Sequence, residues 1–202
     1  MSMRKPIVAL IYDFDGTLSP GNMQEFGFIQ AVGSTPEQFW RMSDSIAIGY
    51  DASNVLAYMK LMFDEAKANG IKLRKEDFRG FGKHIELYDG VRQWFSMVNE
   101  YGKHHGVIIE HYINSSGLKE IIEGSGISHE FKKTYACEFF YDENGLASWP
   151  KLDVNFTNKT QFVYRINKGV LDVAEDRKLN ASMPDDSKRI PFTNMICLGD
   201  GL

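Results

Sequence analysis

The chain has 202 residues, of which 43% are hydrophobic and 25% charged, with a formal net charge of -4. This composition is typical of a globular protein with one full core and a smaller accessory unit. It argues against a nucleic-acid partner, because no run of Lys or Arg forms a basic stripe. It also argues against a membrane partner, because no segment approaches the roughly 18 apolar residues of a membrane helix. Cys137 and Cys197 both lie in apolar segments, so we expect reduced thiols and a cytoplasmic protein.

The first predicted element is the apolar run at residues 7–12, which is short and reads as a strand buried on both faces. Gly16 and Thr17 then break the pattern, so the strand delivers Asp13 and Asp15 at its C-terminal end. Ligands bind at that end of the strands in open α/β sheets. Two acids there are costly unless a cation or a proton neutralises them. We therefore expect a metal site with a carboxylate nucleophile.

The next segment, from about residue 21 to residue 87, reads as a helical insertion. Thr35 begins a start signal with an N-cap threonine, a proline and a glutamine. A second helix is expected from Asp51 to the Asn-Gly pair at 69–70, with apolar residues recurring on one face. A third, short helix is expected from about 75 to 84.

Strands and helices alternate in the remainder of the chain. The expected elements are a helix at 91–101, a strand over 107–113, a helix at 118–123, a β-hairpin of 135–141 and 146–152 around an Asn-Gly turn, a helix at about 157–169, an exposed loop at 175–189 and a strand at 195–198. Strands separated by helices imply right-handed crossovers and a parallel sheet. The sequence thus predicts an α/β fold, with a core formed by residues 1–20 and 88–202.

Polar, small residues end three of the predicted strands, and the ends of parallel strands meet along one edge of a sheet. The first end carries the two aspartates, the second Ser115, Ser116 and Gly117, and the third Gly199 and Asp200. Lys159, at a predicted helix start, can point to the same place. Such a set suits phosphoryl transfer, since a serine and backbone N–H groups at a helix start bind phosphate and a lysine adds positive charge.

Oxygen ligands of this kind favour Mg²⁺, for which the expected protein ligands are Asp13, Asp15 and Asp200. Asp13 is the expected nucleophile, as carboxylates are in aspartyl-phosphate enzymes. Asp15 is then expected to protonate the leaving oxygen and later to activate water.

Structural roles for the same residues remain open at this point. Ser115 could be an ordinary helix N-cap, and Asp200 could be a turn residue beside a glycine. Lys159 has rivals in Lys151 and Lys168, because a lone lysine is usually a solvated charge.

Four segments, in order, resemble the motifs of the haloacid dehalogenase superfamily: Ile-Tyr-Asp13-Phe-Asp15-Gly-Thr-Leu, Ile-Asn-Ser115-Ser-Gly, Asn-Lys159-Thr and Leu-Gly-Asp200-Gly. The insertion and the hairpin resemble the phosphoserine-phosphatase-like branch. The resemblance implies a three-layer, Rossmann-like core with a helical cap at 21–87, Mg²⁺ as cofactor and an aspartyl-phosphate intermediate. The second aspartate of the pair favours phosphatases or phosphotransferases over dehalogenases.

Two departures from the pattern bear on these expectations. The resemblance implies another acid about four residues beyond Asp200 and a longer sheet, so the C-terminal part of the core is expected to be truncated. It also implies an acid near residue 22 for phosphoserine recognition, where this chain has Asn22.

The resulting prediction is a Mg²⁺-dependent phosphatase that hydrolyses a small phosphorylated metabolite. The alternatives are a phosphotransferase or phosphomutase on the same site, and a non-catalytic binding or regulatory module. The sequence gives no indication of the substrate or the oligomeric state.

Overall fold

The structure, a computed structural model, describes residues 5–200 and contains a five-stranded sheet in the order β4-β3-β2-β1-β5. The strands are β1 (Ile7–Tyr12), β2 (Ile108–Leu118), β3 (Lys133–Tyr141), β4 (Ala147–Leu152) and β5 (Met195–Leu198). β1 pairs in parallel with β2 and β5, and β2 pairs in parallel with β3. β4 is antiparallel to β3 and completes the predicted hairpin. The predicted parallel sheet is confirmed.

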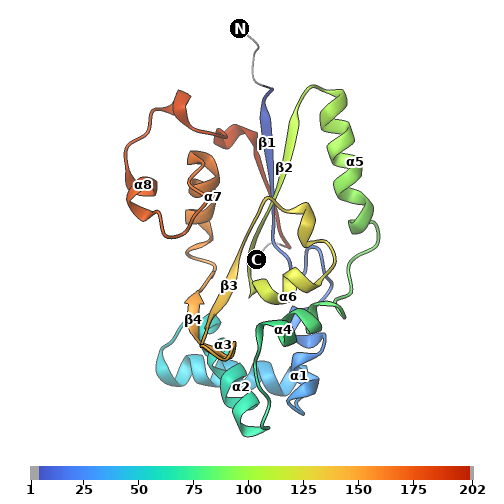
Figure 1. Ribbon diagram of the computed structural model, residues 1–202, viewed down its shortest axis with the longest axis vertical. Helices are drawn as coiled ribbons and strands as arrows, with labels where there is room; N and C mark the ends of the chain where they lie inside the picture. Colours follow the sequence, from blue (N-terminus) through green and yellow to red (C-terminus); the bar gives the residue numbers. More distant parts are fainter. Residues whose placement is uncertain (1–4, 201–202) are drawn as a thin grey trace.

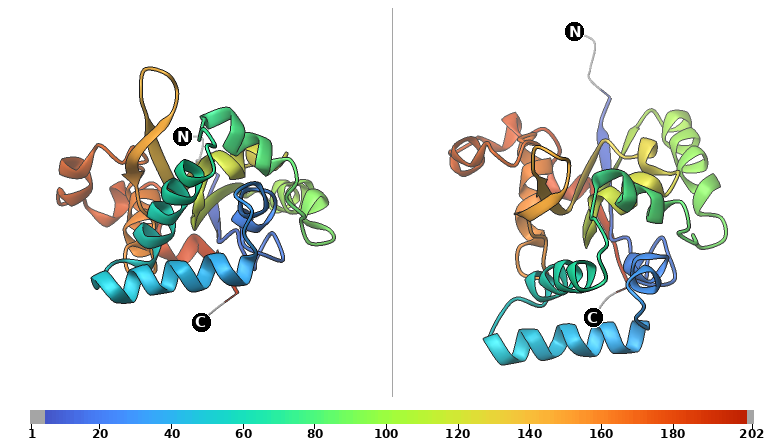
Figure 2. Two further views of the ribbon diagram at one scale, coloured as in Figure 1. Left: turned by 90° about the horizontal axis from the view of Figure 1, so that it is seen from below. Right: turned by 60° about the horizontal axis from the view of Figure 1, so that its bottom comes forward.

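Helices cover the sheet on two sides. Figures 1 and 2 show α5 (Val91–His104) and α6 (Lys119–Gly124) on one side, and α7 (Lys159–Lys168) and α8 (Asp176–Asn180) on the other. This arrangement is the predicted three-layer, Rossmann-like α/β/α core. Short 3-10 turns complete the core at Ser128–Glu130, Asp185–Ser187 and Phe192–Asn194. None of the helices within residues 5–200 is long and apolar enough to cross a membrane.

The segment at 175–189 is not only a loop, as predicted, because it contains α8. The guanidinium group of Arg165, on α7, is almost fully buried and organises this region. It donates hydrogen bonds to the carbonyl oxygens of Asp172 (2.8 Å) and Val173 (3.1 Å), and to the carboxylate of Asp176. These contacts join residues 7 to 11 positions apart, beyond the reach of the turn and capping patterns from which the segment was predicted.

The inner strands are held to α5 by a chain of polar groups, of which Tyr12 and His111 are buried. Trp94 Nε1 donates to the hydroxyl of Tyr12 at 2.9 Å, and that hydroxyl lies 2.9 Å from His111 Nδ1. Burial lowers the pKa of His111, so its ring is neutral and Nδ1 accepts the Tyr12 proton. His111 Nε2 then donates to Asn99 at 3.1 Å. This satisfied chain fixes the end of β1 directly before Asp13.

The helical insertion lies at the end of the sheet where β1 terminates (Figures 1 and 2). Its elements are a 3-10 turn at Met23–Glu25, α1 (Phe28–Ala31), α2 (Pro36–Tyr50), α3 (Asn54–Ala68) and α4 (Lys75–Gly82). The chain leaves and re-enters the core at neighbouring points, because the amide of Tyr88 donates to the carbonyl of Leu18 at 3.0 Å.

Two helix starts in the insertion test the sequence reading. α2 begins as predicted, with Gln38 N donating to Thr35 Oγ1 at 3.3 Å and Thr35 N donating to Gln38 Oε1 at 3.4 Å. The predicted start of the next helix at Asp51 is wrong, since α3 begins at Asn54. Asp51 instead ends α2 in the left-handed conformation, with a φ of 50°. Aspartate tolerates this conformation better than most residues, so it serves here as a helix end.

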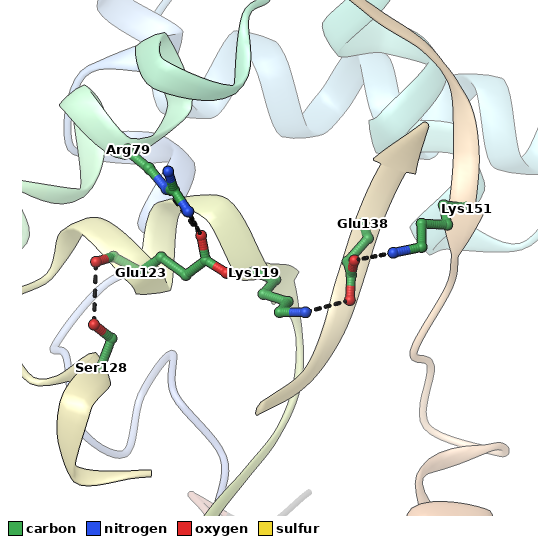
Figure 3. A network of polar contacts seen from close by, with 6 residues as sticks. All are labelled: Arg79, Lys119, Glu123, Ser128, Glu138 and Lys151. Carbon is green, nitrogen blue, oxygen red and sulfur yellow. Dashed lines mark hydrogen bonds and ion pairs between the residues drawn. The ribbon is translucent and has the colours of Figure 1, made fainter. Parts of the chain in front are cut away.

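The insertion is fastened to the core by a close crossing of α4 and α6. Gly82 and Gly124 face each other across it, and a Cβ built on Gly82 would lie 2.0 Å from the carbonyl oxygen of Ile121. Beside this contact, Arg79 of α4 donates two hydrogen bonds to Glu123 of α6, at 2.9 and 2.5 Å. Figure 3 shows this pair and a neighbouring ion cluster, in which Lys119 and Lys151 both bind the carboxylate of Glu138.

An ion cluster ties β2 to the segments that precede β3 and β5. The Glu110 carboxylate accepts from Arg189 Nη1 at 2.7 Å, from Lys132 Nζ at 2.5 Å and from Tyr112 OH at 2.6 Å. Although burial opposes ionisation, these hydrogen bonds lower the pKa of Glu110 to about 2.

Glu110→Gln is therefore expected to lower the free energy of unfolding by about 1–3 kcal/mol at pH 7. The stabilisation is complete above the ordinary glutamate pKa of 4.5 and is lost as the pH falls towards 2, because the unfolded state then binds the proton first. Urea unfolding at pH 7 and pH 3 measures it. Glu100→Gln, at an exposed pair with Lys103, is the control and should have almost no effect. A variant equal to wild type at pH 7 would contradict the assignment.

Candidate active site

The loop after β1 carries the first pair of acids. Tyr12 is paired with Ile113 of β2 and with Leu198 of β5, so Asp13 lies level with the residues that follow those two. Its amide donates to the carbonyl of Leu198 at 2.8 Å, and its Oδ1 accepts from the amide of Phe14 at 2.8 Å. The Asp13 side chain is thereby held at the carboxyl edge of the parallel strands.

Lys159, the first residue of α7, donates from Nζ to Asp13 Oδ2. Each side chain retains about a fifth of its exposure, 21% for the lysine and 22% for the aspartate. The rival lysines are engaged elsewhere. Lys151 binds Glu138, and Lys168 donates to the carbonyl oxygens of Leu179 and Ala181. Of the three candidates, Lys159 is the one that meets Asp13.

Asp15 occupies a different environment from Asp13. Its Oδ1 accepts from the amide of Met23 at 3.0 Å. Burial, followed by the neighbouring charge of Asp13, raises the pKa of Asp15 to about 8. Asp15 is therefore largely protonated at neutral pH. A carboxyl group that keeps its proton at this pH is suited to act as a proton donor in acid–base chemistry.

The segment with Ser115, Ser116 and Gly117 was expected to end a strand and to be followed by a helix at 118–123. The helix is confirmed within one residue as α6, which begins at Lys119, but β2 extends through the segment to Leu118. The register between β2 and β3 shifts between Asn114 and Leu118, so the segment is a bulge in which regular pairing is interrupted. The alternation of apolar residues in the sequence does not predict this bulge, because the bulge arises from the pairing of β2 with β3.

Within this bulge, which we call the serine loop (residues 115–117), both serine side chains are enclosed. Ser115 is fully buried, and its Oγ accepts from the amide of Gly117 at 3.0 Å. Ser116 Oγ is buried without a hydrogen-bond partner among residues 5–200. A Cβ built on Gly117 would lie 3.1 Å from Asp15 Oδ2, so the serine loop contacts the loop after β1 directly.

The side chain of Met23, from the insertion, packs against Gly117 of the serine loop. Its Sδ lies 3.0 Å from the amide nitrogen of Leu118, and a Cβ on Gly117 would come within 2.1 Å of Met23 Cε. Because its amide also donates to Asp15, Met23 links the loop after β1 to the serine loop. A side chain larger than that of glycine at 117 would displace it.

Asp200 closes the set. Gly16 has a φ of 73°, and a Cβ there would lie 2.7 Å from Asp200 Oδ2, so the carboxylate of Asp200 reaches over the loop after β1. Among residues 5–200, no three His, Cys, Asp or Glu side chains are grouped closely enough to hold a metal ion. The donor chemistry nevertheless fits Mg²⁺, since the Asp13 and Asp200 carboxylates and backbone carbonyls are hard oxygen ligands. The Asp200 carboxylate can take its position over Gly16 only because this residue has no Cβ.

A cavity of about 530 Å³ opens beside this set. Asp13, Lys159 and Gly199 line it, as does Asn114, whereas Asp15 and the serine loop do not. Asn114 Nδ2 donates to the carbonyl oxygen of Lys159 at 2.9 Å, while its Oδ1 is buried without a partner among the described residues. The sequence reading missed Asn114, although it directly precedes Ser115. It also missed Met23 and Tyr58, which have no local signal; the Tyr58 hydroxyl donates to the carbonyl oxygen of Ser116.

The fold has known counterparts. A haloacid dehalogenase (HAD) family hydrolase from Salmonella enterica serovar Typhi aligns with a TM-score of 0.59 and 16% identity, over 95% of this chain and 56% of that one. A substrate-bound phosphoserine phosphatase aligns with a TM-score of 0.60 and 12% identity, over 96% and 78%. The chain has the phosphoserine-phosphatase-like fold of the haloacid dehalogenase superfamily.

Sequence comparison also finds a relative of this chain. A Borreliella burgdorferi protein, described as uncharacterized, is 30% identical over 226 aligned positions, which span 100% of this chain and 77% of that protein. The two chains belong to one family. No protein-family profile matches the chain. It spans only about half, 56%, of the Salmonella hydrolase.

Proposed function

We propose that the protein is a Mg²⁺-dependent phosphatase that hydrolyses a small phosphomonoester through a phosphorylated Asp13. The observation that carries the proposal is the pairing of Asp13 with Lys159 in the lining of a cavity, beside a second carboxyl group, that of Asp15, with a raised pKa. The fold, which it shares with a phosphoserine phosphatase and a HAD family hydrolase, supports the same chemistry.

The proposed reaction has two steps. Asp13 attacks phosphorus, forms the aspartyl phosphate and breaks the bond to the leaving oxygen, which takes the proton of Asp15. Asp15, now a carboxylate, then removes a proton from a water molecule that attacks phosphorus. This second attack releases inorganic phosphate and restores both aspartates. Lys159 offsets negative charge on the phosphoryl oxygens throughout.

Mg²⁺, when bound, would offset the charge between Asp13 and the phosphoryl group, with Asp13, Asp15 and Asp200 as its proposed protein ligands. The proposed phosphate-binding groups are Lys159 and the serine loop (Ser115, Ser116 and Gly117).

The helical insertion at 21–87 is proposed to act as a cap on a core formed by 1–20 and 88–202. Met23, which contacts both loops of the site, supports this role. A cap of this kind excludes water and selects the leaving group, so the proposed substrate is a small phosphorylated metabolite. The proposed location of the protein is the cytoplasm. Phosphoserine is not favoured, because Asn22 stands where its recognition implies an acid. Glu25, the next acid along the chain, is already engaged, since it accepts from Asn22 at 2.7 Å and from Trp40 at 2.8 Å.

Phosphate release from an aryl phosphate and a panel of phosphorylated metabolites tests the proposal. We expect release with Mg²⁺, loss of activity in EDTA and recovery when Mg²⁺ is restored. Undiminished release in EDTA would contradict the metal requirement. Transfer of phosphate to added alcohols or sugars in preference to water would favour the phosphotransferase alternative. Mg²⁺ binding without turnover of any substrate would favour the non-catalytic alternative.

A further inference from the structure

One side chain of the helical insertion bonds directly to the backbone of the serine loop. Tyr58, on α3, is 94% buried, since its relative exposure is 6%. Its hydroxyl donates to the carbonyl oxygen of Ser116 at 2.7 Å, across 58 positions of sequence. Burial raises the pKa of Tyr58 well above its usual value, so the hydroxyl keeps the proton that it donates.

The Ser116 carbonyl lies where the sheet provides no regular partner. β2 and β3 are in register at Asn114 and again at Leu118, and Ser116 falls between these positions. Cys137 Sγ, on β3, lies 3.3 Å from the same carbonyl oxygen and is a weak donor. The Tyr58 hydroxyl is therefore the stronger of the two groups that fix the direction of this carbonyl.

The direction of the Ser116 carbonyl also fixes the direction of the Gly117 amide, which is the next hydrogen-bond donor along the chain. A peptide group is planar and trans, so the Ser116 C=O and the Gly117 N–H point in opposite directions and turn together. The Gly117 amide donates to Ser115 Oγ at 3.0 Å, and Gly117 abuts the Asp15 carboxyl group. A rotation of the 116–117 peptide would misalign both the amide and the serine hydroxyl.

We infer that Tyr58 is a positioning residue, which holds the 116–117 peptide so that the Gly117 amide fixes Ser115 Oγ and thereby orients the Ser115 hydroxyl for phosphate. This inference rests on the proposed function for its ligand. It implies that the insertion orients the phosphate-binding groups as well as covering them. Tyr58 touches no reacting atom in this role, and acts through the Ser116 carbonyl.

Tyr58→Phe removes the hydroxyl and keeps the ring. Loss of one hydrogen bond of about 1.4 kcal/mol corresponds to a change of about tenfold in binding. We expect inorganic phosphate to inhibit about tenfold more weakly, the KM for an aryl phosphate to rise by a similar factor, and the Gly117 amide to exchange faster with solvent by NMR. Tyr135→Phe is the matched control, since Tyr135 is fully buried and donates to the carbonyl of Leu171 at 3.0 Å.

The control should lose comparable stability without these changes. Equal effects of both variants on phosphate inhibition, or an unchanged Gly117 amide in Tyr58→Phe, would show that Tyr58 has only a structural role. Cys137→Ala removes the weaker donor, and should change the Gly117 amide in the same direction by less. Lack of phosphate release by the wild type would overturn the proposed function instead, while the response of the Gly117 amide to added inorganic phosphate would still test the positioning role.

Discussion

Asp13→Asn is expected to reduce phosphate release by about a thousandfold or more, as removal of a catalytic nucleophile does. The amide has the same shape, so it can still accept from the Phe14 amide, but it cannot form an acyl phosphate by displacement. The substitution also removes the negative charge that pairs with Lys159. Initial rates with saturating Mg²⁺ and an aryl phosphate measure the loss.

Asp64→Asn is the matched control for this substitution. Asp64 lies on α3 and binds Lys60 at 2.5 Å on an exposed surface, so the same change again removes a carboxylate from a lysine pair. An exposed pair of this kind contributes little to stability, and the control should retain the wild-type rate. Retention of the wild-type rate by Asp13→Asn would rule out the nucleophile assigned here.

Gly82→Ala is expected to lower the free energy of unfolding by about 3 kcal/mol, in the range for overpacking of a close contact. Its Cβ would lie 2.0 Å from the backbone oxygen of Ile121, which cannot move aside as a flexible side chain can. Gly124→Ala should behave alike, since its Cβ would lie 2.1 Å from the carbonyl oxygen of Arg79. Urea unfolding measures both changes.

The same helix supplies a control with the opposite sign. Gly80 also lies on α4, but a Cβ there would meet no atom within 4 Å. Gly80→Ala should therefore raise the free energy of unfolding by about 0.5–1 kcal/mol, through helix propensity alone. Equal effects at Gly80 and Gly82 would contradict the close crossing of α4 and α6 as the fastening of the insertion.

Local signals predicted those parts of the fold that depend on neighbours in sequence. The apolar run at 7–12 gave β1, the Thr35 capping box gave the start of α2, and the Asn-Gly turn gave the β3–β4 hairpin. Each signal acts over a few residues, where backbone propensity and side-chain capping decide the conformation. The order of the motifs then predicted that their polar ends would meet at one edge of the sheet.

Features set by distant partners could not be predicted in this way. The bulge that contains Ser115 arises from its pairing with β3, and helix α8 is held by the buried Arg165, which belongs to another helix, α7. Met23 and Tyr58 belong to the insertion, far in sequence from the loops that they contact. For the site, the structure brings together the polar residues singled out in the sequence, whereas the groups that orient them had no local signal.

The central claim is that Asp13 carries the phosphoryl group, and rapid acid quench tests it most directly. The protein is mixed with Mg²⁺ and a radiolabelled substrate from the panel, quenched within one turnover, digested, and its peptides are mapped. The account predicts label on the peptide that contains Asp13, which appears and decays at rates that match phosphate release. Turnover without labelled protein, or label on Ser115 instead, would contradict it.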